Sequence, residues 1–166
     1  MKNNGISSYG ESVVDHGFSI LRLKNDSEEV LNKKYPVSLE FIQFHFCLKG
    51  QTNFTFNEGN YTFQVLEDHS MLLYNPQKAL PIEVELAPDT WMVSVLISIT
   101  KFHSLFSSDA DHISFLSPDN NSKKYYDNLP FSSSIAVVLS QILQAKVHES
   151  MKSLYFKGKV YELLCL

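Results

Sequence analysis

The chain has 166 residues, which suits one domain of ordinary size, and 44% of them are hydrophobic, including 12 Phe and 8 Tyr. Charged residues make up only 19% of the sequence, which argues against a disordered chain. The formal net charge is -4 and Arg22 is the single arginine, so direct DNA binding by these residues is not expected, because phosphate contacts need positive charge.

The cysteines and the N-terminus indicate a cellular compartment. Cys47 and Cys165 lie far apart without a CxxC motif, which predicts two reduced thiols in a reducing environment. Residues 1–10 are polar and lack the apolar segment of a signal peptide. No apolar run approaches the roughly 20 residues that span a bilayer. We therefore expect a cytoplasmic chain that does not contact a membrane.

The first predicted region, residues 1–36, is an N-terminal arm with a first short strand. Residues 1–17 are polar and show little periodicity, so we expect them to be partly disordered or loosely attached. Residues 18–23 (FSILRL) predict the strand, and the charged residues 24–35 predict a loop or a short helical turn. Pro36 then interrupts the chain.

The second region, residues 37–100, has the pattern of an antiparallel β-domain. Strand-like runs cover residues 41–48, 54–56, 61–65, 70–74, 82–86 and 91–99. Turn residues separate the runs, among them Glu58-Gly59-Asn60 and Glu67-Asp68-His69. Short strands at this spacing, without helices between them, predict a sandwich or a barrel rather than an α/β sheet.

The third region, residues 101–166, predicts a short helix, a polar connector and two amphipathic helices, which form one domain with the barrel. The short helix covers residues 100–106 and the connector residues 107–127. Serines 132–134 offer an N-cap for the next helix. The last helix follows a break near residues 148–150 and is still apolar at its end, so we expect the full protein to continue beyond this chain.

Four segments in this order resemble the N-terminal domain of AraC-type transcription regulators. They are residues 41–50 (FIQFHFCLKG), 59–76 (GNYTFQVLEDHSMLLYNP), 99–106 (ITKFHSLF) and 150–166 (SMKSLYFKGKVYELLCL). They resemble, in turn, the opening strand of the family's cupin barrel, the following hairpin and strand, the short helix after the barrel, and the long helix that leads to the DNA-binding half. Glu67-Asp68-His69 stands where the family often has Gly-Asp, so this turn must form without glycine.

The resemblance covers about residues 37–166 and implies a fold class and a function. The fold class is mainly β with C-terminal α: an antiparallel cupin-like β-barrel (jelly roll) followed by two or three helices. The implied function is effector sensing and dimerisation in a bacterial transcription regulator. The helix-turn-helix half is absent from this chain, so we expect DNA contacts only through that missing half. We also expect a homodimer, and a small-molecule effector that changes the position of the C-terminal helices.

The chemistry-bearing residues do not predict an enzyme. Cupin metalloenzymes need a His-x-His pair followed by Glu and a later His, whereas His45 has Gln43 and Cys47 at the alternate positions. The sequence has no G-x-S-x-G motif, and its glycines are dispersed. We therefore expect no metal, no cofactor and no catalytic residue. Two alternatives stay open, a stand-alone small cupin enzyme and an interaction module that senses no ligand.

The barrel interior is the candidate ligand site. Bulky side chains there either fill the core or line a cavity for a small, largely apolar ligand that polar groups orient. If the aromatic side chains fill the interior, two alternatives stay open: the ligand binds at the mouth of the barrel, or the domain senses through a protein contact instead. The candidate ligand-binding residues are Phe44, His45, Phe46, Phe54, Phe56, Met71, Tyr74 and Trp91.

The C-terminal helices are the candidate dimer interface. Their apolar stripes must be buried, either against the barrel or against a second copy across a two-fold axis. We expect one helix to pack on the barrel and the other to pair with its copy. The candidate dimerisation residues are Ile135, Val138, Leu139, Ile142, Leu143, Leu154, Val160 and Leu163.

Overall fold

The computed structural model describes residues 7–56, 59, 61–75, 79–105 and 125–165. The N-terminal strands are β1 (Ser7–Asp15), β2 (Phe18–Asn25) and β3 (Leu31–Tyr35). The central strands are β4 (Phe41–Lys49), β5 (Gln51–Phe56), β6 (Tyr61–Leu66), β7 (His69–Tyr74), β8 (Ile82–Leu86) and β9 (Thr90–Ser98). The C-terminal part contains α1 (Ile99–Leu105), β10 (Tyr125–Pro130), α2 (Ser133–Leu143) and α3 (Glu149–Leu164).

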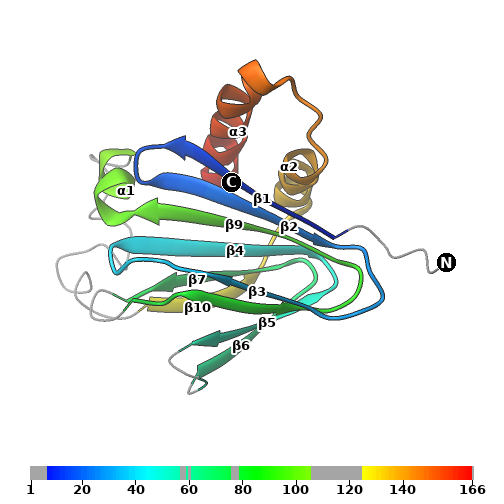
Figure 1. The fold of residues 1–166 in the computed structure, drawn as a ribbon. Helices are drawn as coiled ribbons and strands as arrows, with labels where there is room; N and C mark the ends of the chain where they lie inside the picture. Colours follow the sequence, from blue (N-terminus) through cyan, green and yellow to red (C-terminus); the bar gives the residue numbers. More distant parts are fainter. Residues whose placement is uncertain (1–6, 57–58, 60, 76–78, 106–124, 166) are drawn as a thin grey trace.

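The strands form two antiparallel sheets (Figure 1). Sheet A has the order β1-β2-β9-β4-β7-β10, and sheet B has the order β3-β8-β5-β6. These sheets and the C-terminal helices confirm the predicted antiparallel cupin-like fold. One detail of the prediction changes. Because the edge strands of sheet A do not pair with those of sheet B in the described residues, the strands form an open sandwich and not a closed barrel.

Side chains from both sheets fill most of the space between them. This inner core contains Leu21, Leu23, Val37, Cys47, Phe54, Phe56, Val65, Met71, Leu73, Leu80, Ile82, Val84, Leu86, Met92 and Leu96. The rings of Phe54 and Phe56 stack with their centroids 6.1 Å apart, and Phe56 also contacts Phe63. The aromatic residues of β5 and β6 therefore occupy the volume that a wider barrel would leave for a ligand.

A second core lies between sheet A and the two long helices, which cover the face of sheet A that points away from sheet B (Figure 1). Its fully buried residues include Ile20 and Val95 from the sheet and Leu139 and Val160 from the helices. Burial of each such side chain contributes about 1.5–3 kcal/mol. None of the helices in the described part of the chain is long and apolar enough to cross a membrane.

The helices begin where the sequence predicts them. Ser132 is the N-cap of α2, and its hydroxyl accepts a hydrogen bond from the backbone N–H of Ile135 at 3.4 Å. His148 is the N-cap of α3, at the predicted break, and its Nδ1 accepts from the backbone N–H of Ser150. Local capping and apolar periodicity are therefore sufficient to place both helices.

The N-terminal 36 residues and the polar connector contain strands that the sequence did not predict. β1 pairs with β2 along the edge of sheet A, so the prediction of a loosely attached segment before residue 18 is wrong from Ser7 onward. β3 pairs with β8 where a loop or helical turn was predicted, and β10 pairs with β7 at the end of the connector. Because an edge strand is held by main-chain hydrogen bonds to one neighbour, it does not need an apolar alternation of its own. Residues 106–124, most of the predicted connector, lie outside the described residues.

Two predicted turns join consecutive strands: one joins the paired strands β5 and β6, and the other leads from β6 of sheet B to β7 of sheet A. Asp68 adopts a left-handed conformation with φ 63°, and its backbone N–H donates to the carbonyl oxygen of Cys47 at 2.9 Å. Aspartate tolerates this region of backbone space, so the turn between β6 and β7 forms without glycine as expected. In the turn between β5 and β6, Gly59 has φ 92°, whereas Glu58 and Asn60 lie outside the described residues.

Candidate functional site

A chain of hydrogen bonds crosses the inner core at His45. The Nε2–H of His45 donates to the Gln43 Oε1 atom at 2.8 Å, and the Ser94 hydroxyl donates to His45 Nδ1 at 2.6 Å. The Gln43 amide nitrogen donates to the carbonyl oxygen of Leu80 at 2.6 Å. An amide oxygen can only accept, so the single proton of His45 lies on Nε2. Each of these three hydrogen bonds then has one donor and one acceptor.

His45 is consequently a neutral, fully bonded residue of the core. Burial lowers the pKa of its imidazole to about 3, and its ring packs against Phe54 at a centroid distance of 4.4 Å. Because both ring nitrogens are occupied by Gln43 and Ser94, the arrangement does not fit a metal ligand. Over the described residues, no group of three or more His, Cys, Asp and Glu side chains could hold a metal ion. Burial also raises the pKa of the neighbouring Cys47 thiol to about 12.

The eight predicted ligand-binding residues lie on two different faces of sheet A and on sheet B. Between the sheets lie His45, Phe54, Phe56 and Met71. On the opposite face of sheet A, toward the helices, lie Phe44, Phe46, Tyr74 and Trp91. The expectation that this second group faces the interior is wrong, because adjacent strand residues point to opposite sides. On β4, Gln43 and His45 face inward, so Phe44 and Phe46, which alternate with them, face the helices.

The second group makes contacts within the helical side of the molecule. The ring of Phe44 stacks on Phe102 of α1 at 6.2 Å, and Phe46 contacts Phe131, just before α2, at 6.3 Å. The indole N–H of Trp91 donates to Asp26 at 2.7 Å, while the Lys24 ammonium lies 4.3 Å from its ring centroid. These aromatic residues attach the helices and the β2–β3 loop to sheet A.

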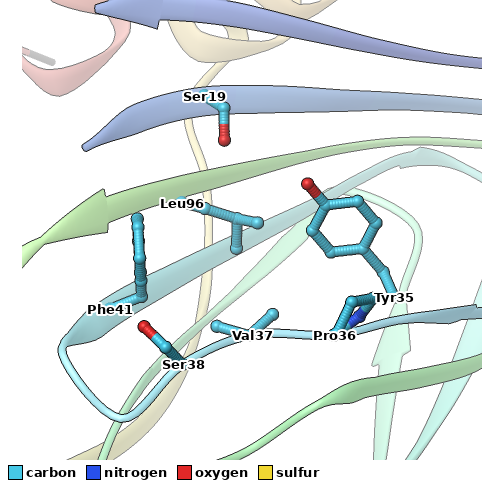
Figure 2. Close-up of a pocket in the computed structure, with 7 residues that line it drawn as sticks. All are labelled: Ser19, Tyr35, Pro36, Val37, Ser38, Phe41 and Leu96. Carbon is cyan, nitrogen blue, oxygen red and sulfur yellow. The ribbon is translucent and has the colours of Figure 1, made fainter. Parts of the chain in front are cut away.

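An open cavity of about 470 Å³ lies at the end of the sandwich where β9 leads into α1. We call it the mouth cavity, and it is lined by Ser19, Tyr35, Pro36, Val37, Ser38, Phe41 and Leu96. Figure 2 shows Tyr35 and Phe41 on opposite sides of the space, with Ser19 and Leu96 above and Val37 below. Its size and mainly apolar wall are typical of small-molecule sites.

The rim of the mouth cavity connects the two sheets. The Tyr35 hydroxyl, on β3 of sheet B, donates to the carboxylate of Glu11, on β1 of sheet A. Val13 lies two residues farther along β1, opposite Ser19 in the strand register, and 66% of its surface is exposed. An exposed apolar side chain and a carboxylate therefore lie together beside the opening.

Two neighbouring cavities share walls with the mouth cavity. One, of about 400 Å³, shares Tyr35 and Pro36 and is also lined by Lys34, Thr55, Phe56, Pro81, Ile82 and Glu83. The other, of about 620 Å³, shares Phe41 and is also lined by Asp15, His16, Gly17, Glu40, Ser98, Thr100, Lys101 and Ser104. Phe56 is the one predicted ligand-binding residue that lines any of these three cavities. Sequence reasoning missed Tyr35 and Phe41, although the aromatic residues on both sides of Pro36 were a signal that could have indicated them.

An ion cluster beside the third cavity joins three elements. The Asp15 carboxylate at the end of β1 contacts the Lys101 ammonium of α1 at 2.9 Å and the Lys157 ammonium of α3 at 3.3 Å. Hydrogen bonds from Lys101, from the backbone of His16 and from Lys157 hold the pKa of Asp15 well below its usual value. The end of the sandwich that contains the mouth cavity is thus connected to α3 through α1 and Asp15.

Both long helices bury most of their predicted interface residues against the chain's own sheet. Buried there are Val138, Leu139, Ile142, Leu143, Val160 and Leu163. Ile135 is half-buried, and Leu154 is 67% exposed. The prediction that one helix keeps its apolar stripe for a second copy therefore does not describe this chain, because sheet A is wide enough to bury both stripes. The exposed apolar residues of the helices are Val137, Met151 and Leu154.

Comparisons with known proteins agree with this architecture. The family model of the regulatory protein PchR N-terminal domain matches residues 25–166. Apo ToxT K231A from Vibrio cholerae strain SCE256 has a TM-score of 0.51 at 12% identity, over 92% of this chain and 57% of that chain. Unsaturated fatty acid bound ToxT from the same strain has a TM-score of 0.47 at 14% identity, over 98% of this chain and 56% of that chain. The Schizosaccharomyces pombe Cnp3 cupin domain has a TM-score of 0.42 at 12% identity, over 64% of this chain and 71% of that chain.

These matches differ in what they establish. None of the curated proteins has a sequence that matches this chain significantly. At 12% identity, apo ToxT shares the fold alone, and this chain spans little more than half the length of the ToxT chains it matches. The family model, in contrast, covers the strands from the end of β2 and all three helices. The chain therefore belongs to the family of PchR N-terminal domains, the regulatory N-terminal domains of AraC-type transcription regulators.

Proposed function

We propose that this chain is the cytoplasmic effector-sensing and dimerisation domain of a transcription regulator, and that a small molecule binds in its mouth cavity. The observation that carries the proposal is the apolar wall formed by Tyr35, Val37 and Phe41 around an open space of about 470 Å³ in a regulatory domain of this family. The domain itself catalyses no reaction. DNA is bound by another part of the full protein, because these residues carry a net charge of -4.

The proposed effector site is at the mouth of the sandwich rather than in its centre. The interior positions next to His45 are occupied by Phe54 and Met71, which are both almost completely buried. A ligand there would have to displace well-packed side chains, which costs several kcal/mol. The mouth cavity can accept a ligand without such displacement.

The route from the mouth cavity to the helices is short. Leu96 lines the cavity, and the same strand continues into α1 after Ser98. Lys101 of α1 then contacts Asp15, which also contacts Lys157 of α3. An effector that favours one arrangement of α1 shifts the population of α3 positions, to the extent that its affinity differs between the arrangements.

A thermal-shift screen of a small-molecule library tests the proposed site. A ligand present at 100 times its dissociation constant stabilises the protein by about 2.7 kcal/mol, which raises the melting temperature measurably. Val37→Trp fills the cavity and is expected to abolish the shift. Val137→Trp, at a position of α2 that is 57% exposed, introduces the same side chain away from the cavity and keeps the shift.

The proposed site is contradicted if the ligands found in the screen raise the melting temperature of Val37→Trp as much as that of the wild type. Because a tryptophan at a buried position can also disturb folding, Ser19→Leu is a second, smaller filling variant. Ser19 lines the same cavity from β2. Wild-type shifts in both filling variants exclude the mouth cavity as the effector site.

The proposal includes a homodimer formed through the helical layer. Met151 and Leu154 are separated by one turn of α3, and their side chains are 52% and 67% exposed. Val137 on α2 is a third exposed apolar side chain on this layer. A second copy that covers these residues removes apolar surface from water and leaves the buried stripes of both helices in place.

A further inference from the structure

Glu11 gives the mouth cavity a negatively charged rim. Its carboxylate accepts the hydrogen bond of the Tyr35 hydroxyl, which comes from the opposite sheet. In the register of β1 and β2, Glu11 lies opposite Leu21, and Val13 lies opposite Ser19. Directly opposed residues point to the same side of a sheet. Glu11 and Val13 therefore extend toward the side on which Ser19 lines the cavity.

Two of the lysines near the mouth cavity contact carboxylates other than Glu11. Lys34 is adjacent to Tyr35, but its ammonium lies 3.9 Å from Glu83 and the residue lines the neighbouring cavity. Lys101 contacts Asp15 at 2.9 Å. Glu40, next to Phe41, adds a second exposed carboxylate on this end of the sandwich. The exposed carboxylates of Glu11 and Glu40 favour a cation at this rim and disfavour an anion.

The hydrogen-bonding groups at the rim also favour a donor. The Tyr35 proton is committed to Glu11, so toward a ligand the carboxylate and the phenolic oxygen present lone pairs only. Farther in, the wall of Val37, Phe41 and Leu96 is apolar. The exposed Val13 extends this apolar surface to the outside. A ligand that fits both parts has an apolar body and a hydrogen-bond-donating end.

From this arrangement we propose that the mouth cavity binds a small apolar molecule that ends in an amine or hydroxyl group rather than a carboxylate. The apolar body lies against Val37 and Phe41, and the amine or hydroxyl donates to Glu11. This inference rests on the proposed effector role of the mouth cavity and adds the chemical class of the effector to it.

Three probes with one apolar body and different end groups test this inference. They are octylamine, octanol and octanoic acid, and isothermal titration calorimetry at neutral pH and low ionic strength measures their affinities. We expect octylamine to bind about tenfold more tightly than octanoic acid, with octanol between them, because the carboxylate of Glu11 attracts one head group and repels the other. Added salt reduces the difference, since Glu11 is exposed.

Glu11→Gln removes the charge and keeps an oxygen that accepts the Tyr35 hydroxyl. In this variant we expect the affinities for octylamine and octanoic acid to differ by less than about threefold. Glu85→Gln is the matched control, because Glu85 is an exposed carboxylate on β8 that lines none of the three cavities. It leaves the preference for octylamine at the wild-type value.

Tighter binding of octanoic acid than of octylamine overturns the inference, and so does an amine preference that persists in Glu11→Gln. If octanoic acid is preferred and Val37→Trp abolishes its binding, the mouth cavity remains the effector site and only the chemical class is wrong. If Val37→Trp changes the affinity of none of the probes that bind, the inference and the proposed site both fail. Absence of binding by all three probes also overturns the inference, and the library screen then decides the proposed site separately.

Discussion

At the scale of single residues, the titration of His45 makes stability depend on pH. The imidazole is buried and neutral, and its pKa is lowered to about 3 by burial, whereas an unfolded histidine has its ordinary value of about 6.5. Between these values the unfolded chain takes up a proton that the native state does not. The free energy of unfolding therefore falls as the pH falls below about 6.5, by about 1.4 kcal/mol for each pH unit from this group.

Urea unfolding of His45→Gln at several pH values between neutral and acidic checks this expectation. The variant retains a side-chain donor for Gln43 but cannot titrate, so its stability depends less steeply on pH than that of the wild type. His103→Gln, at an exposed position of α1, controls for the loss of an imidazole and keeps the wild-type slope. A wild-type slope in His45→Gln would show that His45 does not carry this dependence.

At the scale of elements, α3 is held to sheet A by Phe156. The Phe156 side chain is 1% exposed, and the Arg22 guanidinium of β2 lies 4.5 Å from its ring centroid. Phe156→Ala leaves a cavity under the helix and is expected to lower the free energy of unfolding by about 3–5 kcal/mol. Chemical denaturation followed by circular dichroism measures the change.

Gly158, one half-turn away on the same helix, is the matched control. An added Cβ at Gly158 meets no heavy atom within 4 Å, and the residue is exposed. Gly158→Ala should raise the free energy of unfolding by about 1 kcal/mol, because glycine is a poor residue in the middle of a helix. If Phe156→Ala and Gly158→Ala changed the free energy of unfolding equally, α3 would not be held to sheet A through its Phe156 side.

At the scale of the whole molecule, sheet A belongs to both cores. Cys47 faces the inner core from β4, while Phe46, the residue before it, belongs to the core under the helices. Loss of one core removes one side of the same strands, so we expect the two cores to unfold together. In a Cys165→Ser variant, urea should expose Cys47 to a thiol reagent at the same midpoint at which the helical signal disappears. Two separate midpoints would show that the helical layer unfolds independently.

The homodimer is also a property of the whole molecule. Leu154→Glu places a charge on the exposed side of α3 and is expected to shift sedimentation equilibrium from dimer to monomer. Leu66→Glu, at a position of β6 that is 45% exposed, introduces the same charge away from the helices and leaves the dimer intact. If the wild-type protein is monomeric at all concentrations tested, the proposed homodimer is wrong.

Much of the fold could be predicted from local patterns. Alternation marks β4 to β9, and an N-cap serine with an apolar stripe marks α2. β1, β3 and β10 were not predicted as strands, since their pairing depends on neighbouring strands rather than on their own composition. Of the candidate ligand residues, Phe56 lines a cavity, whereas the walls of the mouth cavity come from residues 35–41 and from Ser19 and Leu96, which are far apart in the sequence.

The sequence by itself predicted the strands β4 to β9 followed by the helices, and the resemblance to AraC-type regulators. Only the tertiary structure decided which face of each strand is inside. β4 has a polar face with His45 and an apolar face with Phe46, and alternation alone assigns the apolar face to the interior. Both faces of sheet A are buried, however, because the helices cover the outer one. The polar set is directed inward, where a closed chain of hydrogen bonds compensates its burial, and the open space remains at the mouth of the sandwich.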